Sequence, residues 1–173
     1  EPISLDKITN RVSVLSTGLN IDPIVVVQKA VPGLYSDISS VEIDTYLAET
    51  AAALTVEHPD YSYLAARIKV NSLHKETPGF IIATKNLYDD GLLREEYYKK
   101  VMENADSIES VIDYDKDYTF DYFALTTLIR AYLLKFDNKT IERPQDLWMR
   151  VTLTVTGNEF NLDKIKETYK NLS

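Results

Sequence analysis

Side chains with reactive or metal-binding chemistry are few in this sequence. It contains no cysteine, which excludes disulfides, thiolate metal sites and any reaction carried on a thiol of this chain. The two histidines, His58 and His74, are far apart and lack the spacing of a helical metal site. Asp113, Asp115 and Asp117 alternate as in a calcium loop, but no glycine occupies the turn and no glutamate closes it. We therefore predict no metal site in this chain, and we expect these carboxylates to be solvated or to cap helices.

Two arginines in the last third of the chain are the other candidates for binding an anion. Arg143 directly precedes Pro144, which can open a helix over residues 145–154, and Arg150 lies within that helix. We expect both arginines to hold the last helices together through contacts with carboxylates rather than to bind a substrate.

The stretch from Ser39 to Thr77 is the one around which we expect the neighbouring elements to pack. Its residue pattern predicts two consecutive helices. Ser39 and Glu42 have the spacing of a capping box at the start of the first helix. The second helix is expected to start near Pro59, because proline has no amide hydrogen that would need a partner there. Apolar residues recur along one face of each helix: Ile43, Leu47, Ala51 and Leu54 in the first, and Leu64, Ile68 and Leu73 in the second.

Helical patterns cover most of the remaining sequence. Asp22 and Pro23 suit the N-cap and first position of a short helix that Pro32-Gly33 ends. Further helices are predicted over residues 4–19, 80–89, 92–104, 107–112 and 122–135 and from about Asn161 onward, with an extended or looped link over residues 114–120. Pro78-Gly79 is the clearest internal break, and it divides the sequence into predicted domains of residues 1–77 and 78–173.

Composition limits the possible partners. The 173 residues are 45% hydrophobic and 27% charged, as in an ordinary globular protein of one or two domains. A net charge of −8 disfavours a nucleic-acid groove or binding to an anionic membrane surface. No apolar run is long enough to span a bilayer, and the first residues do not have the pattern of a signal peptide. We predict no nucleic-acid or membrane partner, and a cytoplasmic location, with which the absence of cysteine is compatible.

Several short sequence motifs in the first half of the chain resemble those of a known protein family. Between residues 42 and 75 they are Glu42-Ile43-Asp44, Ala48-Glu49-Thr50-Ala51-Ala52, His58-Pro59-Asp60-Tyr61, Leu64-Ala65-Ala66-Arg67-Ile68 and Leu73-His74-Lys75. Before them come Leu5-Asp6-Lys7-Ile8, Gly18-Leu19-Asn20, Asp22-Pro23 and Gly33-Leu34-Tyr35-Ser36. In order and spacing these words closely resemble the ATP cone, the regulatory nucleotide-binding module of the class I ribonucleotide reductase large subunit.

The second half resembles the helical domain that precedes the catalytic barrel in the same family. The matching words are Tyr114-Asp115-Lys116-Asp117, Phe120-Asp121-Tyr122-Phe123, Tyr132-Leu133-Leu134-Lys135, Glu142-Arg143-Pro144-Gln145, Met149-Arg150-Val151 and Glu167-Thr168-Tyr169 with Leu172-Ser173. Lys116 stands where the family usually has arginine, and Ala124 where it usually has glycine. The resemblance implies a mainly α fold, in which an ATP-cone-like helical bundle that lacks part of its N-terminal hairpin is followed by a second helical domain.

The resemblance also implies a nucleotide site without a catalytic residue. Lys7 and Lys75 match positions that meet the phosphates, and Ser40 and Asp44 match polar positions near the sugar and base. Glu1 and Ser4 match positions on or beside the hairpin, and Asn71 matches a pocket wall. On residue types alone, the simpler interpretation is that these lysines are ordinary solvated side chains and that Ser40 is part of a helix cap.

Regulation is the function that the resemblance implies. In the family this region senses ATP against dATP as allosteric effectors, with Mg²⁺ as a possible companion, and so controls oligomeric state and deoxyribonucleotide synthesis for DNA replication. Implied partners are the rest of the large subunit, further copies of it and the small radical-generating subunit. The family reduces ribonucleotides through cysteines, so this cysteine-free chain is expected to be non-catalytic by itself. Two alternatives stay open: a helical protein-interaction module that binds no nucleotide, and a structural region that supports the barrel.

Overall fold

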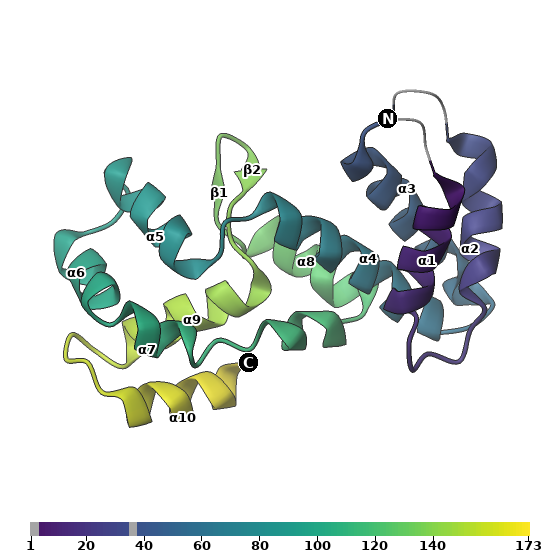
Figure 1. The fold of residues 1–173 in the computed structure, drawn as a ribbon. Coiled ribbons are helices and arrows are strands. Elements are labelled where there is room, and N and C mark those ends of the chain that lie inside the picture. The colour runs from purple at the N-terminus through teal and green to yellow at the C-terminus, as the bar shows by residue number, and fades with distance from the viewer. Residues whose placement is uncertain (1–3, 35–37) are drawn as a thin grey trace. The chain divides into compact units, whose positions relative to one another are not determined.

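The computed structural model describes residues 4–34 and 38–173, and helices dominate this part of the chain (Figure 1). The mainly α fold class is thereby confirmed. By their internal packing the residues form two compact units. The first unit comprises the described residues up to Leu73 together with Tyr118–Thr127, and the second comprises His74–Asp117 with Leu128–Ser173.

The elements of the first unit start where the sequence supplies a cap. In chain order they are α1 (Leu5–Leu15), α2 (Pro23–Ala30), a 3-10 turn (Val31–Gly33), α3 (Ser40–Ala53), a second 3-10 turn (Leu54–Val56) and α4 (Asp60–Glu76), whose last residues belong to the second unit. Asp22 accepts a hydrogen bond from the Ile24 amide at 2.9 Å, with Pro23 at the first helical position. The capping box of α3 is formed in both directions: Ser39 Oγ accepts from the Glu42 amide at 3.2 Å, and Glu42 Oε2 accepts from the Ser39 amide at 2.9 Å.

The core of the first unit lies among its four helices. Apart from Ile43, which is half-buried, the predicted apolar faces of α3 and α4 are buried. The principal core residues are Ile8, Val12, Val26, Leu47, Ala51, Leu54, Leu64 and Ile68. Burial of this apolar surface is the main source of stability for the helical bundle.

A distant segment completes the first unit. Arg67 on α4 donates to the carbonyls of Leu15 and Thr17 at 2.9 and 2.8 Å, where α1 ends, and to the Tyr118 carbonyl at 3.4 Å. Ser62 Oγ accepts a hydrogen bond from the Tyr122 amide at 3.1 Å, and the Tyr122 ring packs against the core. One arginine therefore fixes both the end of α1 and the start of the segment Tyr118–Thr127.

The second unit gathers the remaining helices around a smaller core. They are α5 (Phe80–Asp89), α6 (Glu95–Glu103), α7 (Ala105–Glu109), α9 (Pro144–Val155) and α10 (Leu162–Leu172), while α8 (Tyr122–Ala131) contributes residues to both units. Core residues include Phe80, Val101, Ile108, Met149, Leu153 and Ile165. Lys100 donates to the carbonyls of Leu153 (2.9 Å) and Gly157, so a lysine satisfies orphan carbonyls at the C-terminal end of α9.

Two local predictions for the second half were wrong. Residues 132–135 do not continue α8; they lead into a hairpin of β1 (Lys135–Phe136) and antiparallel β2 (Lys139–Thr140). Asp137 and Asn138 form its two-residue turn with φ of 46° and 61°, the left-handed pair typical of a type I′ turn. Tyr114–Thr119 is a 3-10 helix rather than an extended link, because its carboxylates and aromatic side chains have specific partners, described below.

Leu64 tests the predicted buried face of α4. Its side chain is fully buried, so Leu64→Ala should lower the free energy of unfolding by about 2–5 kcal/mol through lost apolar burial and a residual cavity. The measurement is urea denaturation followed by circular dichroism. Val56→Ala is the matched control, since Val56 is 91% exposed in the same unit and its truncation should change the unfolding free energy by less than about 0.5 kcal/mol. Equal effects of the two substitutions would contradict the assignment.

Candidate functional site

Helices α1, α3 and α4 carry the predicted nucleotide-binding residues that the structure describes. These are Ser4 and Lys7 at the start of α1, Ser40 and Asp44 at the start of α3, and Asn71 and Lys75 in the last turns of α4. Glu1 lies outside the described residues. Ser4 is the N-cap of α1 and accepts a hydrogen bond from the Lys7 amide at 3.4 Å.

A buried ion pair joins two of these helices. Asp44 on α3 is only 2% exposed, and the Arg11 guanidinium on α1 forms a salt bridge with its carboxylate. Because burial of an unpaired carboxylate is costly, this contact with Arg11 compensates the charge of Asp44. The pair therefore fixes α3 against α1 at a defined position.

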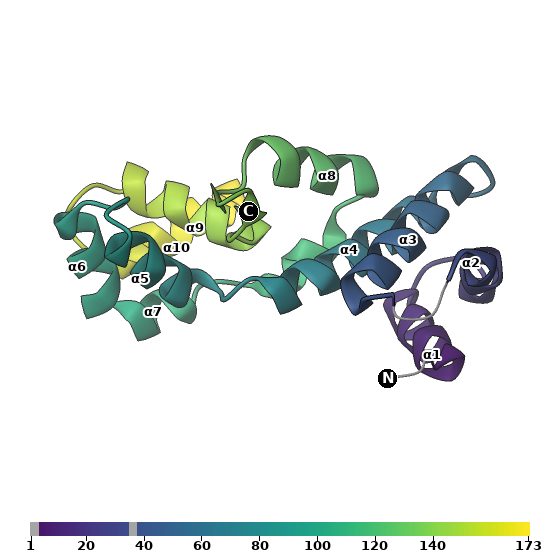
Figure 2. The same ribbon diagram turned by 90° about the horizontal axis from the view of Figure 1, so that it is seen from above.

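Helices α1 and α3 both begin at the end of the first unit that lies uppermost in Figure 1, and Figure 2 shows the same helices from above; the Arg11–Asp44 salt bridge joins them. Lys7 precedes Arg11 by one helical turn, and Ser40 precedes Asp44 by one turn. Lys7 and Ser40 are exposed. The structure thus brings Lys7, Ser40 and Asp44 to the same end of two neighbouring helices, with exposed polar groups outside a buried ion pair.

Ser40 is exposed at this end and does not supply the cap of α3. Ser39, not Ser40, supplies the hydroxyl that caps α3, so the simple capping interpretation of Ser40 does not hold. The N-termini of α1 and α3 also present the positive ends of their helix dipoles there, which favours an anionic ligand.

Asn71 and Lys75 lie further along α4. Asn71 is half-buried in the first unit, and Lys75 is exposed in the last turn of α4, which packs as part of the second unit. The residue that sequence reasoning missed is Arg11. Its one-turn spacing from Lys7 was visible in the sequence, but nothing local pointed to Asp44 as its partner.

The second unit contains a buried polar cluster that the sequence predicted only in part. Asp117 is fully buried, with Oδ2 2.7 Å from His74 Nε2 and Oδ1 accepting from the Gln145 amide at 3.1 Å. Burial raises the pKa of Asp117, while His74 and Gln145 oppose that rise. Asp117 is therefore not solvated, but its contact with the Gln145 amide caps the first turn of α9, which was the other expectation for these carboxylates, and His74 is its partner in a structural contact. Asp113 does act as a local cap, since its Oδ1 accepts from the Asp115 amide at 3.2 Å.

The two arginines differ in their contacts. Arg150 pairs with Glu142, its Nε 2.7 Å from Oε1, as expected. The Arg143 side chain instead donates to Thr77 Oγ1 at 2.9 Å and to the carbonyls of Thr77 and His74 at 2.7 and 3.1 Å. The predicted carboxylate contact is thus confirmed for Arg150, whereas Arg143 binds backbone carbonyls and a hydroxyl.

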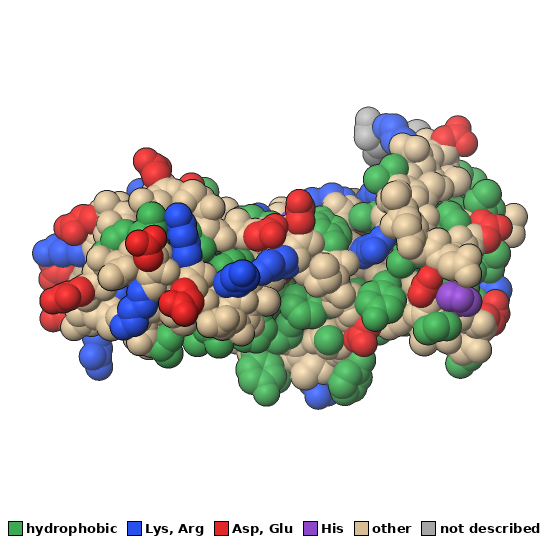
Figure 3. Space-filling model, turned by 90° about the horizontal axis from the view of Figure 1, so that it is seen from below, with side chains coloured by type: hydrophobic (Ala, Val, Ile, Leu, Met, Phe, Trp, Pro, Cys, Tyr) green, Lys and Arg blue, Asp and Glu red, His purple; other side chains and the backbone are tan. Residues whose placement is uncertain are grey.

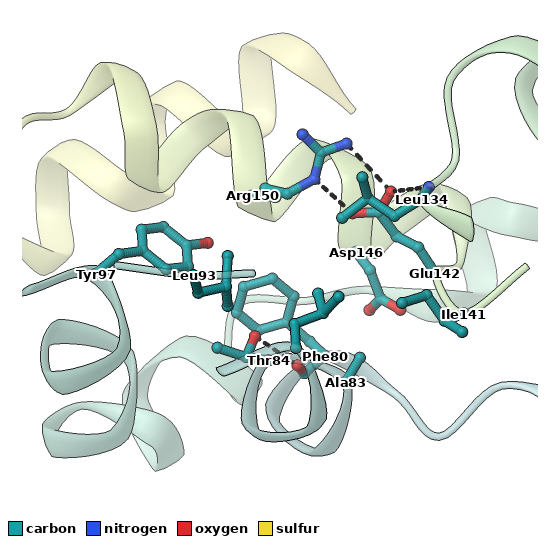
Figure 4. A pocket seen from close by; sticks show the side chains of 11 residues that line it. Phe80, Ala83, Thr84, Leu93, Tyr97, Leu134, Ile141, Glu142, Asp146 and Arg150 are labelled. Carbon is teal, nitrogen blue, oxygen red and sulfur yellow. Dashed lines mark hydrogen bonds and ion pairs between the residues drawn. The ribbon is translucent and has the colours of Figure 1, made fainter. Parts of the chain in front are cut away.

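The Arg150–Glu142 pair borders a small cavity in the second unit (Figure 4). Phe80, Leu93 and Ile141 contribute apolar walls, and the cavity has a volume of about 20 Å³, room for a single water molecule. The Tyr97 ring also lines it, and its buried hydroxyl has no hydrogen-bond partner among the described residues. A cavity of this size and lining cannot accept a nucleotide.

Other classes of site find little support in the part of the chain that the structure describes. It brings together no group of three histidine, aspartate or glutamate side chains that could hold a metal ion. Within the same residues, no helix combines the length and apolarity needed to cross a membrane. On the face seen in Figure 3, basic and acidic side chains are interspersed. The strongest candidate site is therefore the N-terminal end of α1 and α3.

Comparison with known proteins identifies related families for both ends of the chain, including the part that carries this candidate site. A family model described as the ATP cone domain matches residues 1–76, and one described as the ribonucleotide reductase all-alpha domain matches residues 118–173. Ribonucleoside-diphosphate reductase large chain 2 of Saccharomyces cerevisiae is 40% identical over 186 aligned residues, covering 100% of this chain and 21% of that protein. The large subunits of Caenorhabditis elegans and Dictyostelium discoideum are 40% and 41% identical over all of this chain, which covers 23% and 22% of them. The chain thus spans about a fifth of the length of these relatives.

The buried polar cluster makes a prediction about pH. Asp146 accepts from Tyr114 Oη at 2.6 Å and from the Arg143 amide at 3.0 Å, but burial outweighs these contacts and raises its pKa from 3.8 to about 6. A raised carboxyl pKa stabilises the fold below pH 4, and that contribution is lost as pH rises through 6. Relative to Asp146→Asn, the unchanged protein should lose about 2 kcal/mol of unfolding free energy between pH 4 and pH 7.

Urea denaturation across that pH range measures the difference. Asp163→Asn, which alters an exposed carboxyl of the same unit, is the matched control. A difference between the unchanged protein and Asp146→Asn that stays constant with pH would contradict the prediction.

Proposed function

Because the chain belongs to the ribonucleotide reductase large-subunit family, we propose that it is a regulatory region that binds ATP or dATP as an allosteric effector. In this proposal residues 1–77 form the nucleotide-binding domain, and residues 78–173 form a helical domain. The observation that carries the proposal is the convergence of the ATP-cone match with the end of α1 and α3, where Lys7 and Ser40 lie outside the Arg11–Asp44 pair.

The donor set fits a nucleotide. Lys7 supplies an exposed ammonium group, which acts as a point charge for phosphates, and the resemblance assigns the same role to Lys75. Ser40 and Asp44 supply a hydroxyl and a carboxylate for the sugar and base, and the resemblance adds Ser4, Asn71 and Glu1 to the set. Mg²⁺, where present, would arrive with the phosphates, since this cation is commonly held by phosphate oxygens and water.

Regulation follows from linkage. A nucleotide that binds one assembly of the protein more tightly than another shifts the population towards that assembly. We propose that ATP and dATP act in this way on the oligomeric state of a cytoplasmic ribonucleoside-diphosphate reductase, and so on deoxyribonucleotide supply for DNA replication. The partners would be the rest of the large subunit, further copies of it and the small radical-generating subunit.

One observation favours a second candidate, a helical interaction module without nucleotide binding. Phe123 on α8 is 79% exposed, and aromatic side chains are enriched where one protein surface contacts another. The two candidates differ in one measurable property, which is saturable binding of an adenine nucleotide.

Calorimetric titration with ATP and dATP tests the proposal. We expect saturable binding that is weakened at least roughly tenfold by Lys7→Ala or Lys75→Ala, because each substitution removes a charge-assisted contact to phosphate. Lys29→Ala is the matched control: Lys29 is an exposed lysine that pairs with Glu57 on the first unit, and its loss should leave nucleotide affinity unchanged. Absence of binding by the unchanged protein would favour the interaction module.

Asp44→Asn tests the role of the buried carboxylate. The amide can still accept a hydrogen bond from Arg11. We therefore expect the substitution to change the ratio of the ATP and dATP dissociation constants more strongly than it lowers the melting temperature. The comparison is the ratio of the ATP and dATP dissociation constants against the melting temperature. A large loss of stability with an unchanged ratio would make Asp44 a purely structural residue.

A further inference from the structure

We infer that the small cavity of the second unit is a binding site for one water molecule, which bridges the Tyr97 hydroxyl to the Arg150–Glu142 ion pair (Figure 4). This water site does not depend on nucleotide binding. It creates a polar link between α6, which carries Tyr97, and α9, which carries Arg150.

The Tyr97 hydroxyl needs a hydrogen-bond partner from outside the described protein atoms. It is buried and forms no hydrogen bond with any of them. Burial of a hydroxyl without a partner costs free energy, so native structures nearly always satisfy such groups with protein atoms or ordered water. Burial also raises the pKa of Tyr97, so the hydroxyl keeps its proton and can both donate and accept a hydrogen bond.

The cavity beside this hydroxyl has the size and the lining that hold water. Its volume of about 20 Å³ exceeds the roughly 10–15 Å³ that one water molecule requires. A purely apolar cavity stays dry, but Glu142, Asp146 and Arg150 also line this one. A buried water molecule is held by about two to four polar groups, and these side chains together with Tyr97 supply that number.

The ion pair has capacity for a further hydrogen bond. Arg150 donates to Glu142 at 2.7 Å from Nε and at 3.2 Å from a terminal nitrogen. Glu142 Oε2 also accepts from the Leu134 amide at 2.9 Å. A guanidinium has more N–H donors than these two contacts use, and a carboxylate has about four acceptor positions, so each group can still bind water. Figure 4 shows the Tyr97 hydroxyl directed towards the side of the cavity where Arg150 and Glu142 lie.

A water molecule at this position joins α6 to two other segments of the second unit. Arg150 lies on α9, and Glu142 holds the Leu134 amide directly before the β1–β2 hairpin. The Arg150 side chain is 29% exposed, so the water can exchange with solvent at the edge of the cavity. Through this water the Tyr97 hydroxyl stabilises the packing of α6, whereas in a dry cavity the same hydroxyl would oppose it.

The substitution Tyr97→Phe in the whole protein tests the water bridge, because a hydrated and a dry cavity predict opposite results. If water satisfies the hydroxyl, its removal deletes a hydrogen bond and leaves the water with fewer partners. The melting temperature should then fall by roughly 2–4 °C. If the hydroxyl is instead an unpaired buried group, its removal relieves that cost, and the melting temperature should stay the same or rise.

Tyr132→Phe is the matched control for the loss of a tyrosine hydroxyl. Tyr132 is 61% exposed in the same unit, so this substitution should leave the melting temperature unchanged. An unchanged or raised melting temperature in Tyr97→Phe would overturn the inference.

A high-resolution crystal structure of the whole protein observes the site directly. We expect one ordered solvent molecule at roughly 2.6–3.2 Å from Tyr97 Oη and from a polar atom of Arg150 or Glu142. In the crystal structure of Tyr97→Phe that molecule should be lost. An empty cavity in the unchanged protein, a direct hydrogen bond between Tyr97 and Glu142 in its place, or a solvent molecule that keeps its position in Tyr97→Phe would each contradict the bridge.

Discussion

The salt bridge between Arg11 and the buried carboxylate of Asp44 is the interaction on which the geometry of the first unit depends. The apolar core can bring α1 and α3 together, but hydrophobic contacts are non-directional and tolerate small shifts in how two helices meet. A buried charge tolerates far less, because displacement from its partner exposes the full desolvation cost. The ion pair therefore converts a packed bundle into one in which the polar ends of α1 and α3 are held in a fixed relationship.

The same constraint operates in the second unit with different partners. Asp117 is held by His74 and the Gln145 amide, and Glu142 by Arg150. Asp146 receives hydrogen bonds from a tyrosine hydroxyl and a backbone amide, and burial raises its pKa to about 6 because these contacts and the nearby Arg143 charge do not offset it. Each buried carboxylate thus fixes the approach of two segments.

Local chemistry explains which elements could be predicted from the sequence. Helix caps and apolar helix faces depend on residues within a few positions of one another, so the local pattern was enough to predict them. This holds for the N-caps at Asp22 and Ser39 and for the apolar faces that end at Leu54 and Leu73. The hairpin was missed because the turn at Asp137 and Asn138 is flanked by strands of only two residues, too short to show alternation. The burial of Asp117 could not be read locally, because its partners at residues 74 and 145 lie far away in the sequence.

The candidate site shows the same division between local and distant information. Helical spacing places Lys7 one turn from Arg11 and Ser40 one turn from Asp44, but only the fold reveals that Arg11 and Asp44 meet. The resemblance named positions that are predicted to face a ligand, and Arg11 was not among them. A residue whose role is a contact with a distant helix is harder to predict, since no local pattern names its partner.

The two compact units do not correspond to two continuous stretches of the chain. The family model for the all-alpha domain begins at residue 118, yet Tyr118–Thr127 packs as part of the first unit, where the ATP-cone match lies. Arg67 joins this segment to the end of α1, the helix that also carries Lys7 and Arg11. Ser62 Oγ accepts a hydrogen bond from the Tyr122 amide. The end of α1 and the backbone that leads into α8 are therefore linked by hydrogen bonds to one guanidinium rather than through the intervening sequence.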